Sequence, residues 1–553
     1  MSQREYWLPP EILRKVISYF ISPVIYIAES SVAPYATVSR DWQAIIERYT
    51  FSTLRLNNRR RLEEFRQITA RDKRRRSYIR KIKLTVQLES YYAELRREFE
   101  TPEEHSRNNK IFEETILSLL RYLATWSENR AGIKLSIAAQ SLSDSIYDGF
   151  EEVRRKENIL SNDLLHRRFE RSYLQVQEDN MRKIPAVNVI TKLKVIGGHA
   201  GDRLIQPVSC AIIASRLPRL HSISLRLWDS EKRDKALREA NRNGKHTVNH
   251  DQFARYSNIW PSSVKHFKLY FWYDPPEDHT YFPAGIVGVD VEDPLSVSLR
   301  HFSQQLTTIT LTGVVGREFF WPFDSKGQLP FWPNLRDIYL EHKKITPSGQ
   351  WLFEYNPEDD VNEWEPLAMY GEDLLRSRPD YLLPPAEDRN INQFRTKASG
   401  LMSDFYVSAG HAAQRMPKLK SMVLASGPSG ELWTHRFEYT TDGENSLLYW
   451  LDEVPFQPEK RVLQVWREVA REHTGSISNL YIARSLGSLI RRDALLLDVI
   501  GLSIFKALIC SSSSSLTPAR LILPDNNPDP CDTRPRPEQL TSSPLSRLYQ
   551  PRS

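Results

Sequence analysis

The sequence is short of cysteine, and its few cysteines are far apart. The 553 residues include three cysteines, Cys210, Cys510 and Cys531. An odd number at such wide spacing builds neither a disulfide framework nor a zinc site of cysteine ligands. The sequence therefore predicts a protein of a reducing compartment.

A long apolar run is also lacking. The most apolar stretch, residues 494–510, is interrupted by Asp498 and Lys506 and is too short to span a bilayer comfortably. The first seven residues contain no apolar segment of the kind that a secretory signal needs. We expect no membrane partner, and a cytoplasmic or nuclear location or both.

The motifs of common catalytic sites are missing as well. Residues 194–201 resemble a strand that enters a glycine turn, but they match neither the dinucleotide pattern nor the phosphate-loop pattern. His246 and His250 are four residues apart without a third metal ligand, and Ser408 and His411 lack a nucleophile elbow. The sequence predicts a protein that is not an enzyme and that holds no metal and no cofactor.

Charge is nearly balanced overall but unevenly distributed. The formal net charge is +7, yet residues 55–83 hold thirteen Arg and Lys against three acids, and residues 354–388 hold eleven acids against two Arg. Within the basic segment, the run Lys73, Arg74, Arg75 and Arg76 fits a nuclear import signal or a phosphate-binding patch, and equally a solvated loop. Aromatic residues do not alternate with these basic residues, which disfavours nucleic acid as a partner.

Periodicity near the N-terminus predicts a compact helical unit over residues 1–56. Pro9 and Pro10 can begin a helix, where a missing N–H group costs little. Two apolar stripes follow at helical spacing: Ile12, Leu13, Val16, Ile17 and Phe20, then Val38, Trp42, Ile45, Ile46 and Tyr49. Two short helices cannot bury both stripes alone, so they need the following domain, a partner, or both.

Residues 57–475 are expected to form one α/β domain that carries repeats. A six-residue signature, apolar-x-x-apolar-x-apolar, recurs with spacings from 29 to more than 80 residues. Its copies are Ile79/Ile82/Leu84, Ile190/Leu193/Val195, Leu220/Ile223/Leu225, Val264/Phe267/Leu269, Leu306/Ile309/Leu311, Leu335/Ile338/Leu340 and Leu419/Met422/Leu424. Short strands repeated after small-residue turns are typical of leucine-rich-repeat solenoids. We therefore predict an irregular leucine-rich-repeat-like solenoid with a parallel sheet and an acidic insertion at residues 354–392.

Other segments carry weaker signals. Residues 51–91 predict a strand, a basic loop and a second strand, and residues 150–183 a charged, exposed helix or loop. Residues 476–510 form an apolar segment that the pattern does not place. Residues 511–553 contain nine Ser and eight Pro and predict a disordered tail.

The opening unit resembles an F-box. The residues that carry the resemblance are Leu8-Pro9-Pro10-Glu11-Ile12-Leu13, then Ile17 and Phe20, then Ala36-Thr37-Val38-Ser39-Arg40-Asp41-Trp42 and Ile45. The wider chain is similar to large F-box-like proteins of filamentous fungi, in which a Pro-Tyr-Ala-Thr-Val-Ser-Arg-x-Trp-Gln segment precedes Thr-Phe-x-x-Leu-x-Leu. These match residues 34–43 and 50–56. The match covers the first 56 residues well and the remainder thinly.

The resemblance implies partners and a role. F-boxes dock onto the Skp-type adaptor of cullin-RING (SCF) ubiquitin ligases, and their later domains hold a protein substrate. The residues expected to contact the Skp-type adaptor are Leu8, Pro9, Ile12, Leu13, Ile17, Val38, Trp42 and Ile45. Apolar helical surfaces of this kind associate with grooves on partner proteins.

Two alternatives remain open. In one, the chain is a repeat scaffold unconnected with ubiquitination, and the N-terminal helices only cap its own solenoid. In the other, the basic segment at residues 55–83 binds nucleic acid.

Overall fold

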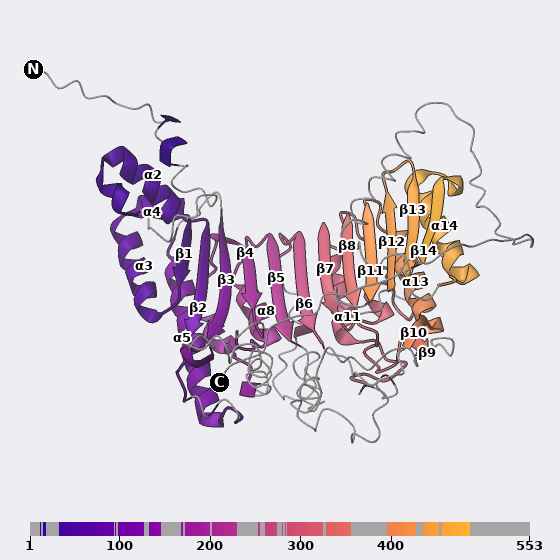
Figure 1. Ribbon diagram of the computed structural model, residues 1–553, viewed down its shortest axis with the longest axis horizontal. Coiled ribbons are helices and arrows are strands. Elements are labelled where there is room, and N and C mark those ends of the chain that lie inside the picture. The colour runs from indigo at the N-terminus through magenta and orange to yellow at the C-terminus, as the bar shows by residue number, and fades with distance from the viewer. Residues whose placement is uncertain are drawn as a thin grey trace, which may run out of the picture. The chain divides into compact units, whose positions relative to one another are not determined.

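One large sheet organises the computed structural model of this chain (Figure 1). The structure describes residues 11–12, 15–17, 33–92, 95, 98–126, 132–144, 168–169, 172–198, 202–228, 253–254, 260–273, 279, 283, 285–324, 328–355, 395–426, 435–452 and 456–486. Contacts divide the chain into two units, residues 1–489 and 490–553, and all described residues belong to the first.

The sheet has twelve strands, in the order β1-β2-β3-β4-β5-β6-β7-β8-β11-β12-β13-β14. Their bounds are β1 Thr53–Leu56, β2 Lys81–Gln87, β3 Ile133–Gln140, β4 Ile190–Ile196, β5 Ser222–Trp228, β6 His266–Trp272, β7 Thr308–Gly313, β8 Asp337–His342, β11 Ser421–Ser426, β12 His435–Thr441, β13 Ser446–Asp452 and β14 Leu480–Leu486. All neighbouring strands are parallel except β12, which is antiparallel to β11 and to β13. β9 (Phe353–Tyr355) and β10 (Arg395–Ala398) form a separate antiparallel pair.

The six-residue signature marks the strands correctly. In β5, for example, Ile223 and Leu225 lie in the strand and Leu220 lies just before it, and all three are buried. The polar residues between them point to the other face, because successive side chains of a strand alternate. The expected α/β class with a large, mostly parallel sheet is confirmed.

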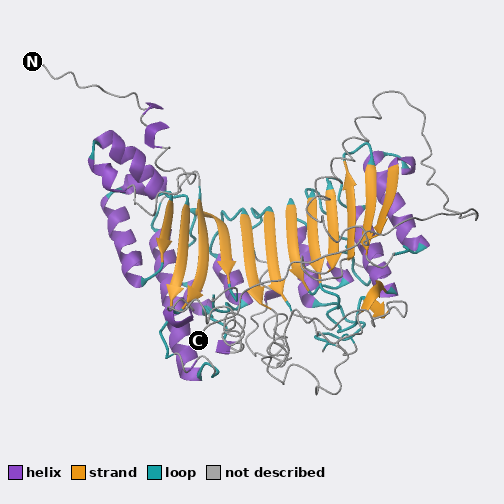
Figure 2. Cartoon of the chain, in the orientation of Figure 1, coloured by secondary structure: helices purple, strands orange, loops and turns teal. Residues whose placement is uncertain are grey.

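Helices cover the apolar face of the sheet. In Figure 2, α8 and α11 lie behind the strands, and the core joins buried side chains of these helices to the buried strand positions. The helices are α2 Arg40–Thr50, α3 Arg59–Arg71, α4 Lys73–Tyr78, α5 Pro102–Ala124, α7 Glu178–Arg182, α8 Pro207–Ser215, α11 Pro294–Ser303, α13 Gly400–Ala413 and α14 Lys460–Thr474. Short 3-10 helices occupy Ala33–Thr37, Leu142–Asp144, Arg317–Phe319 and Ile477–Asn479. Within the described residues no helix is long and apolar enough to span a membrane.

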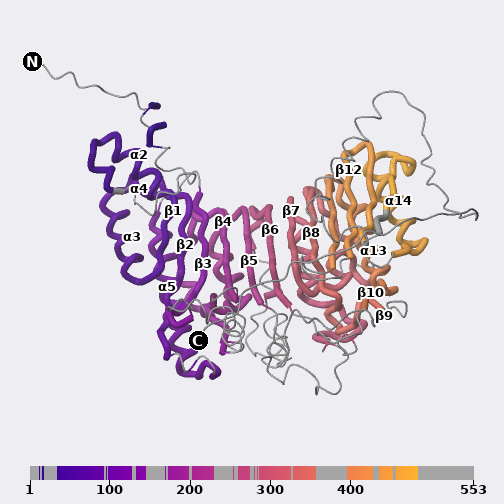
Figure 3. Tube along the Cα trace, in the orientation of Figure 1, coloured from indigo at the N-terminus to yellow at the C-terminus, as the bar shows by residue number. Residues whose placement is uncertain are grey.

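The opposite face of the sheet, which we call the open face, carries mainly polar side chains over β1 to β8. Strand register aligns Lys83, Ser136, Lys194, Ser224 and Lys268 in one row across β2 to β6. Figure 3 shows that these strands follow one another in sequence order across the sheet. The row therefore joins residues far apart in the chain.

The prediction of a basic loop between the two strands of residues 51–91 is wrong, because the structure has two helices there, α3 and α4. Asn58 caps α3 by accepting a hydrogen bond from the Arg61 N–H at 2.8 Å, and Asp72 caps α4 in the same way. Leu62 and Phe65 then bury one side of α3 against the core. Arg is a good helix former, so the charge that suggested a loop is compatible with a helix.

Several expectations concern the ends and insertions of the chain. The previously unplaced residues 480–486 form β14 and pair with β13 at the edge of the sheet. Residues 356–392 of the acidic insertion, His246, His250 and the predicted tail at 511–553 lie outside the described residues.

Helices α13 and α14 approach closely at Gly410. A Cβ atom there would lie 2.7 Å from Val465 Cγ1, whereas a Cβ at Gly400, at the start of the same helix, would meet nothing within 4 Å. We expect Gly410→Ala to lower the free energy of unfolding by about 1–3 kcal/mol through overpacking. Gly400→Ala should be neutral or slightly stabilising, because Ala favours a helix.

Thermal unfolding of the two variants tests this contact. The Gly410→Ala/Val465→Ala double variant should be more stable than the sum of the single effects predicts, because the clash is shared. Equal melting temperatures for Gly410→Ala and Gly400→Ala would contradict the close approach.

Candidate functional site

The N-terminal helical unit is the first candidate site, and its second helix is well defined. Ser39 begins α2 by accepting a hydrogen bond from the Trp42 N–H at 3.2 Å, a standard N-cap. Ile17 and Ile46 are each 2% exposed and pack together with Trp42 and Ile45. The two apolar stripes of the unit therefore contact each other.

The residues expected to bind an adaptor separate into three groups. Ile17 is buried inside the unit, so it supports the helix pair and does not present a surface to a partner. Trp42 and Ile45 are partly buried, whereas Ile12 and Val38 are 47% and 60% exposed. Leu8, Pro9 and Leu13 lie outside the described residues.

Further aromatic side chains accompany the exposed pair. Tyr35 and Tyr49 are each 47% exposed, and the Tyr35 ring lies 6.5 Å from that of Trp42. Single exposed apolar residues are ordinary, but several within so short a segment are typical of an interaction surface. Sequence periodicity predicted Ile12, Val38 and Tyr49 on helices without separating inward from outward positions. Val38 instead lies at the bend between the 3-10 helix and α2.

An ion pair fastens α2 to α4. Arg75 Nη2 donates to Glu47 Oε1 at 2.6 Å, and the guanidinium lies 5.3 Å from the centroid of the Phe51 ring. This hydrogen bond from Arg75 holds the pKa of Glu47 below its ordinary value, although burial opposes it. Neither partner could be paired from the sequence, because they are 28 positions apart.

The four residues of the predicted import signal therefore do not share one exposed surface. Arg75 turns toward α2, and Arg76 lies over the Trp126 ring at 5.2 Å while its Nε donates to the Thr69 carbonyl at 2.9 Å. Lys73 and Arg74 remain exposed. The run is a helix with two inward Arg residues rather than a continuous basic surface.

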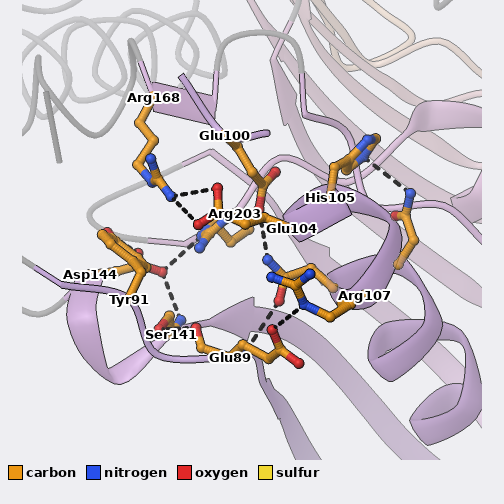
Figure 4. A network of polar contacts seen from close by, with 12 residues as sticks. Glu89, Tyr91, Glu100, Glu104, His105, Arg107, Ser141, Asp144, Arg168 and Arg203 are labelled. Atoms are coloured by element: carbon orange, nitrogen blue, oxygen red, sulfur yellow. Dashed lines mark hydrogen bonds and ion pairs between the residues drawn. The ribbon is translucent and has the colours of Figure 1, made fainter. Parts of the chain in front are cut away.

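A buried polar network lies beyond the carboxyl ends of β2, β3 and β4 (Figure 4). Arg203 Nε donates to Asp144 Oδ2 at 2.9 Å, and Arg203 Nη1 donates to Glu100 Oε1 at 3.2 Å. The Tyr91 hydroxyl donates to Asp144 Oδ1 at 2.7 Å, and burial raises the pKa of Tyr91. These contacts join three connecting segments of the first strands.

Arg168 anchors a fourth segment to the same network. Its Nη2 donates to both carboxylate oxygens of Glu104 at 3.0 Å, and its Nη1 donates to the Leu95 and Glu98 carbonyls. Arg168 and Phe169 are buried, which corrects the expectation of an exposed segment over residues 150–183 for this part of it. Buried charges need such partners, and paired groups drawn from separate segments are typical of a structural network.

The nucleophile-like residues also occupy structural positions. Ser408 and His411 lie within α13, and Ser408 is buried. Gly198, in the turn after β4, has a φ of +74°, which favours glycine for conformational reasons. Groups of three or more residues that could hold a metal are absent from the described part of the chain.

A cavity of about 510 Å³ lies where β9 and β10 meet α13 and α14. Its lining includes Trp351, Phe353, Arg395, Asp404 and Arg461. Arg461 forms ion pairs with Asp404 and with Glu459, the latter at 2.7 Å. Two of the charged groups that line this cavity, Arg461 and Asp404, are thus paired with each other.

The Glu47–Arg75 pair predicts a pH-dependent attachment of α2. Glu47→Gln should lower the local free energy of opening of α2 by about 1 kcal/mol at neutral pH, the upper end for a partly exposed ion pair. Because the pKa of Glu47 is lowered on folding, its contribution is complete above about pH 5 and is lost as the pH falls through the folded pKa. The variant and the unsubstituted chain should therefore converge in acid.

Hydrogen exchange of the α2 amides, corrected for intrinsic rates, measures this opening. The double variant Glu47→Gln/Arg75→Gln serves as the control, because it should lose no more than the Arg75→Gln single variant. A difference that persists unchanged below pH 3 would contradict the role given to the carboxylate.

Comparison with known proteins finds a match for the C-terminal part of the described chain. Residues 392–497 match a protein family of unknown function, DUF6546. The described part of this range contains β10 to β14, α13 and α14, and it contributes Arg395, Asp404 and Arg461 to the cavity. No curated protein and no solved structure matches the chain.

Proposed function

We propose that this chain is an F-box-type adaptor, the substrate-recognition subunit of an SCF-like cullin-RING ubiquitin ligase. Its N-terminal helices bind a Skp-type adaptor, and its large sheet domain holds a protein target. It acts without catalysis, in the cytoplasm, the nucleus or both. Its effect is to raise the concentration of a bound target near the ubiquitin-loading machinery.

The observation that carries the proposal is the exposure of Ile12 and of Val38, which lies at the bend before α2, beside a packed cluster of Ile17 and Ile46. Ile17 and Ile46 pack together inside the unit, whereas Ile12 and Val38 lie outside this cluster. Burying two such side chains in a partner is worth roughly 1.5–3 kcal/mol each. The unit thus combines a packed apolar cluster with apolar side chains that are exposed on its surface.

The arrangement of the sheet supports a leucine-rich-repeat-like domain with insertions. Strands β1 to β8 lie in the sheet in sequence order and are all parallel, so each strand pairs with the strand that precedes it in the chain. The apolar signature marks β2, β4 to β8 and β11, whereas the connections between these strands vary in length. Stacked strand units with variable connections are typical of repeat proteins that bind other proteins.

Co-purification with a Skp-type adaptor tests the docking surface. We expect Ile12→Asp/Val38→Asp to weaken adaptor binding about tenfold or more, because each substitution buries a charge in an apolar interface. Val289→Asp/Val291→Asp is the matched control, since those valines are 59% and 54% exposed elsewhere. Equal recovery of the adaptor with both double variants, or none with the unsubstituted chain, would overturn the proposal.

A capping role is the second candidate, and the Glu47–Arg75 pair favours it. That pair holds α2 against α4, beside the first strand of the sheet. Deletion of residues 1–50 separates the two functions. If the helices are a docking module, residues 51–553 retain a cooperative thermal transition and the circular dichroism of the sheet domain but no longer bind the Skp-type adaptor. If the helices are a cap, the truncated chain does not fold.

A further inference from the structure

The open face of the sheet carries a continuous field of positive charge. Every strand from β1 to β6 places at least one Lys or Arg there, and none of the strands β1 to β7 contains an Asp or a Glu. One representative from each strand gives the set that we call the basic field: Arg55, Lys83, Lys134, Lys194, Arg226 and Lys268.

Strand register brings these charges together. Lys83, Lys194 and Lys268 belong to one row, separated within it by Ser136 and Ser224. Neighbouring strands are about 4.8 Å apart, so the field from β1 to β6 is about 24 Å wide. Hydroxyl groups and ammonium groups therefore alternate along the row, and both donate hydrogen bonds to anions.

These charges repel one another in the free protein. Burial lowers the pKa of Lys194, and the charges of Arg226, Lys134, Lys81 and Lys83 lower it further. In the described part of the chain, none of the six members of the basic field forms an ion pair within 4.0 Å. A face of unpaired like charges is stabilised when an anion binds.

The charge changes sign along the sheet. The polar positions of β7 hold only Thr308, Thr310 and the buried Thr312, and β8 then presents Asp337 and Glu341. A uniform polyanion that extended past the basic field would meet these carboxylates. A polypeptide can change its charge along its length, so the gradient favours a protein ligand over a nucleic acid.

Aromatic side chains border the field. The rings of Trp228 and Trp272 are stacked with centroids 6.0 Å apart at the carboxyl ends of β5 and β6. The Arg226 guanidinium lies 5.3 Å from the centroid of the Tyr270 ring. Aromatic and Arg side chains beside one another are typical of protein-binding surfaces.

We propose that the open face over β1 to β6 binds an Asp- and Glu-rich segment of a partner polypeptide, whose carboxylates pair with the basic field. An extended segment of about seven residues spans this width. The inference rests on the proposed function, because it specifies the chemistry of the protein target that the adaptor captures.

A fluorescein-labelled 14-residue peptide of alternating Glu and Ser is the probe, with the Gln and Ser peptide as its neutral counterpart. Full-length chain should bind the acidic peptide at low salt, and 300 mM salt should weaken binding severalfold through screening. Lys83→Glu/Lys194→Glu/Lys268→Glu should weaken binding at least tenfold. The matched control Lys110→Glu/Arg121→Glu/Arg467→Glu makes the same change of net charge at exposed helix positions and should stay within about twofold.

A single, charge-removing variant tests whether the loss of binding arises from misfolding. Lys194→Gln removes one charge from the repelling group, so its melting temperature should equal or exceed that of the unsubstituted chain while peptide binding weakens. Loss of binding together with a lower melting temperature would instead indicate a structural role for Lys194.

Several outcomes would overturn the proposal. These are no binding of the acidic peptide at low salt, equal binding of the neutral peptide, or equal weakening by both triple variants. Tighter binding of a labelled 20-nucleotide single-stranded DNA that displaces the peptide would assign the face to nucleic acid. Recovery of a Skp-type adaptor by the Lys83→Glu/Lys194→Glu/Lys268→Glu variant is measured in parallel. An unsubstituted chain that recovers the adaptor but does not bind the peptide contradicts only this proposal, whereas an unsubstituted chain that binds the peptide but recovers no adaptor contradicts the proposed function.

Discussion

Burial of one side of a twelve-stranded sheet beneath helices is the constraint on which the rest of the structure depends. Strands β1 to β13 of this sheet give buried apolar residues to a single core that also includes α5, α8, α11, α13 and α14. With the helices of that core on one side, the polar positions of β1 to β8 are left together on the other side. The open face is therefore a direct product of the packing, and its chemistry is free to vary without disturbing the core.

The two ends of the sheet are completed by different means. At the first strands, charged groups such as Arg203 and Asp144 join the connecting segments through buried ion pairs. At the last strands, aromatic packing dominates, and the Trp466 ring lies 4.8 Å from that of Phe437 and 5.2 Å from that of Tyr439. Buried ion pairs impose specific geometry, whereas aromatic contacts contribute mainly apolar burial. The matched family covers the aromatic end.

Local periodicity predicted the strands well because each is defined by its own six residues. Ile223 and Leu225 could be placed on one side of a strand without knowledge of any partner strand. The helices at residues 59–78 were missed because a dense run of Arg obscured the spacing of Leu62 and Phe65. Contacts between distant segments, such as Glu47 with Arg75, could not be predicted because no local pattern records them. The row of Lys83, Lys194 and Lys268 could not be predicted from the sequence for the same reason, because these residues are aligned only by the register of five strands.

The lysines of the open face also bear on how the sheet assembles. A strand that slipped by one residue against its neighbour would turn its lysines inward and its leucines and isoleucines outward. An unpaired ammonium group in the apolar interior costs several kcal/mol, so each misaligned pairing is penalised strand by strand. Lys81 and Lys83 in β2, and Lys192 and Lys194 in β4, thus discriminate against wrong alignments during folding, before any partner is present.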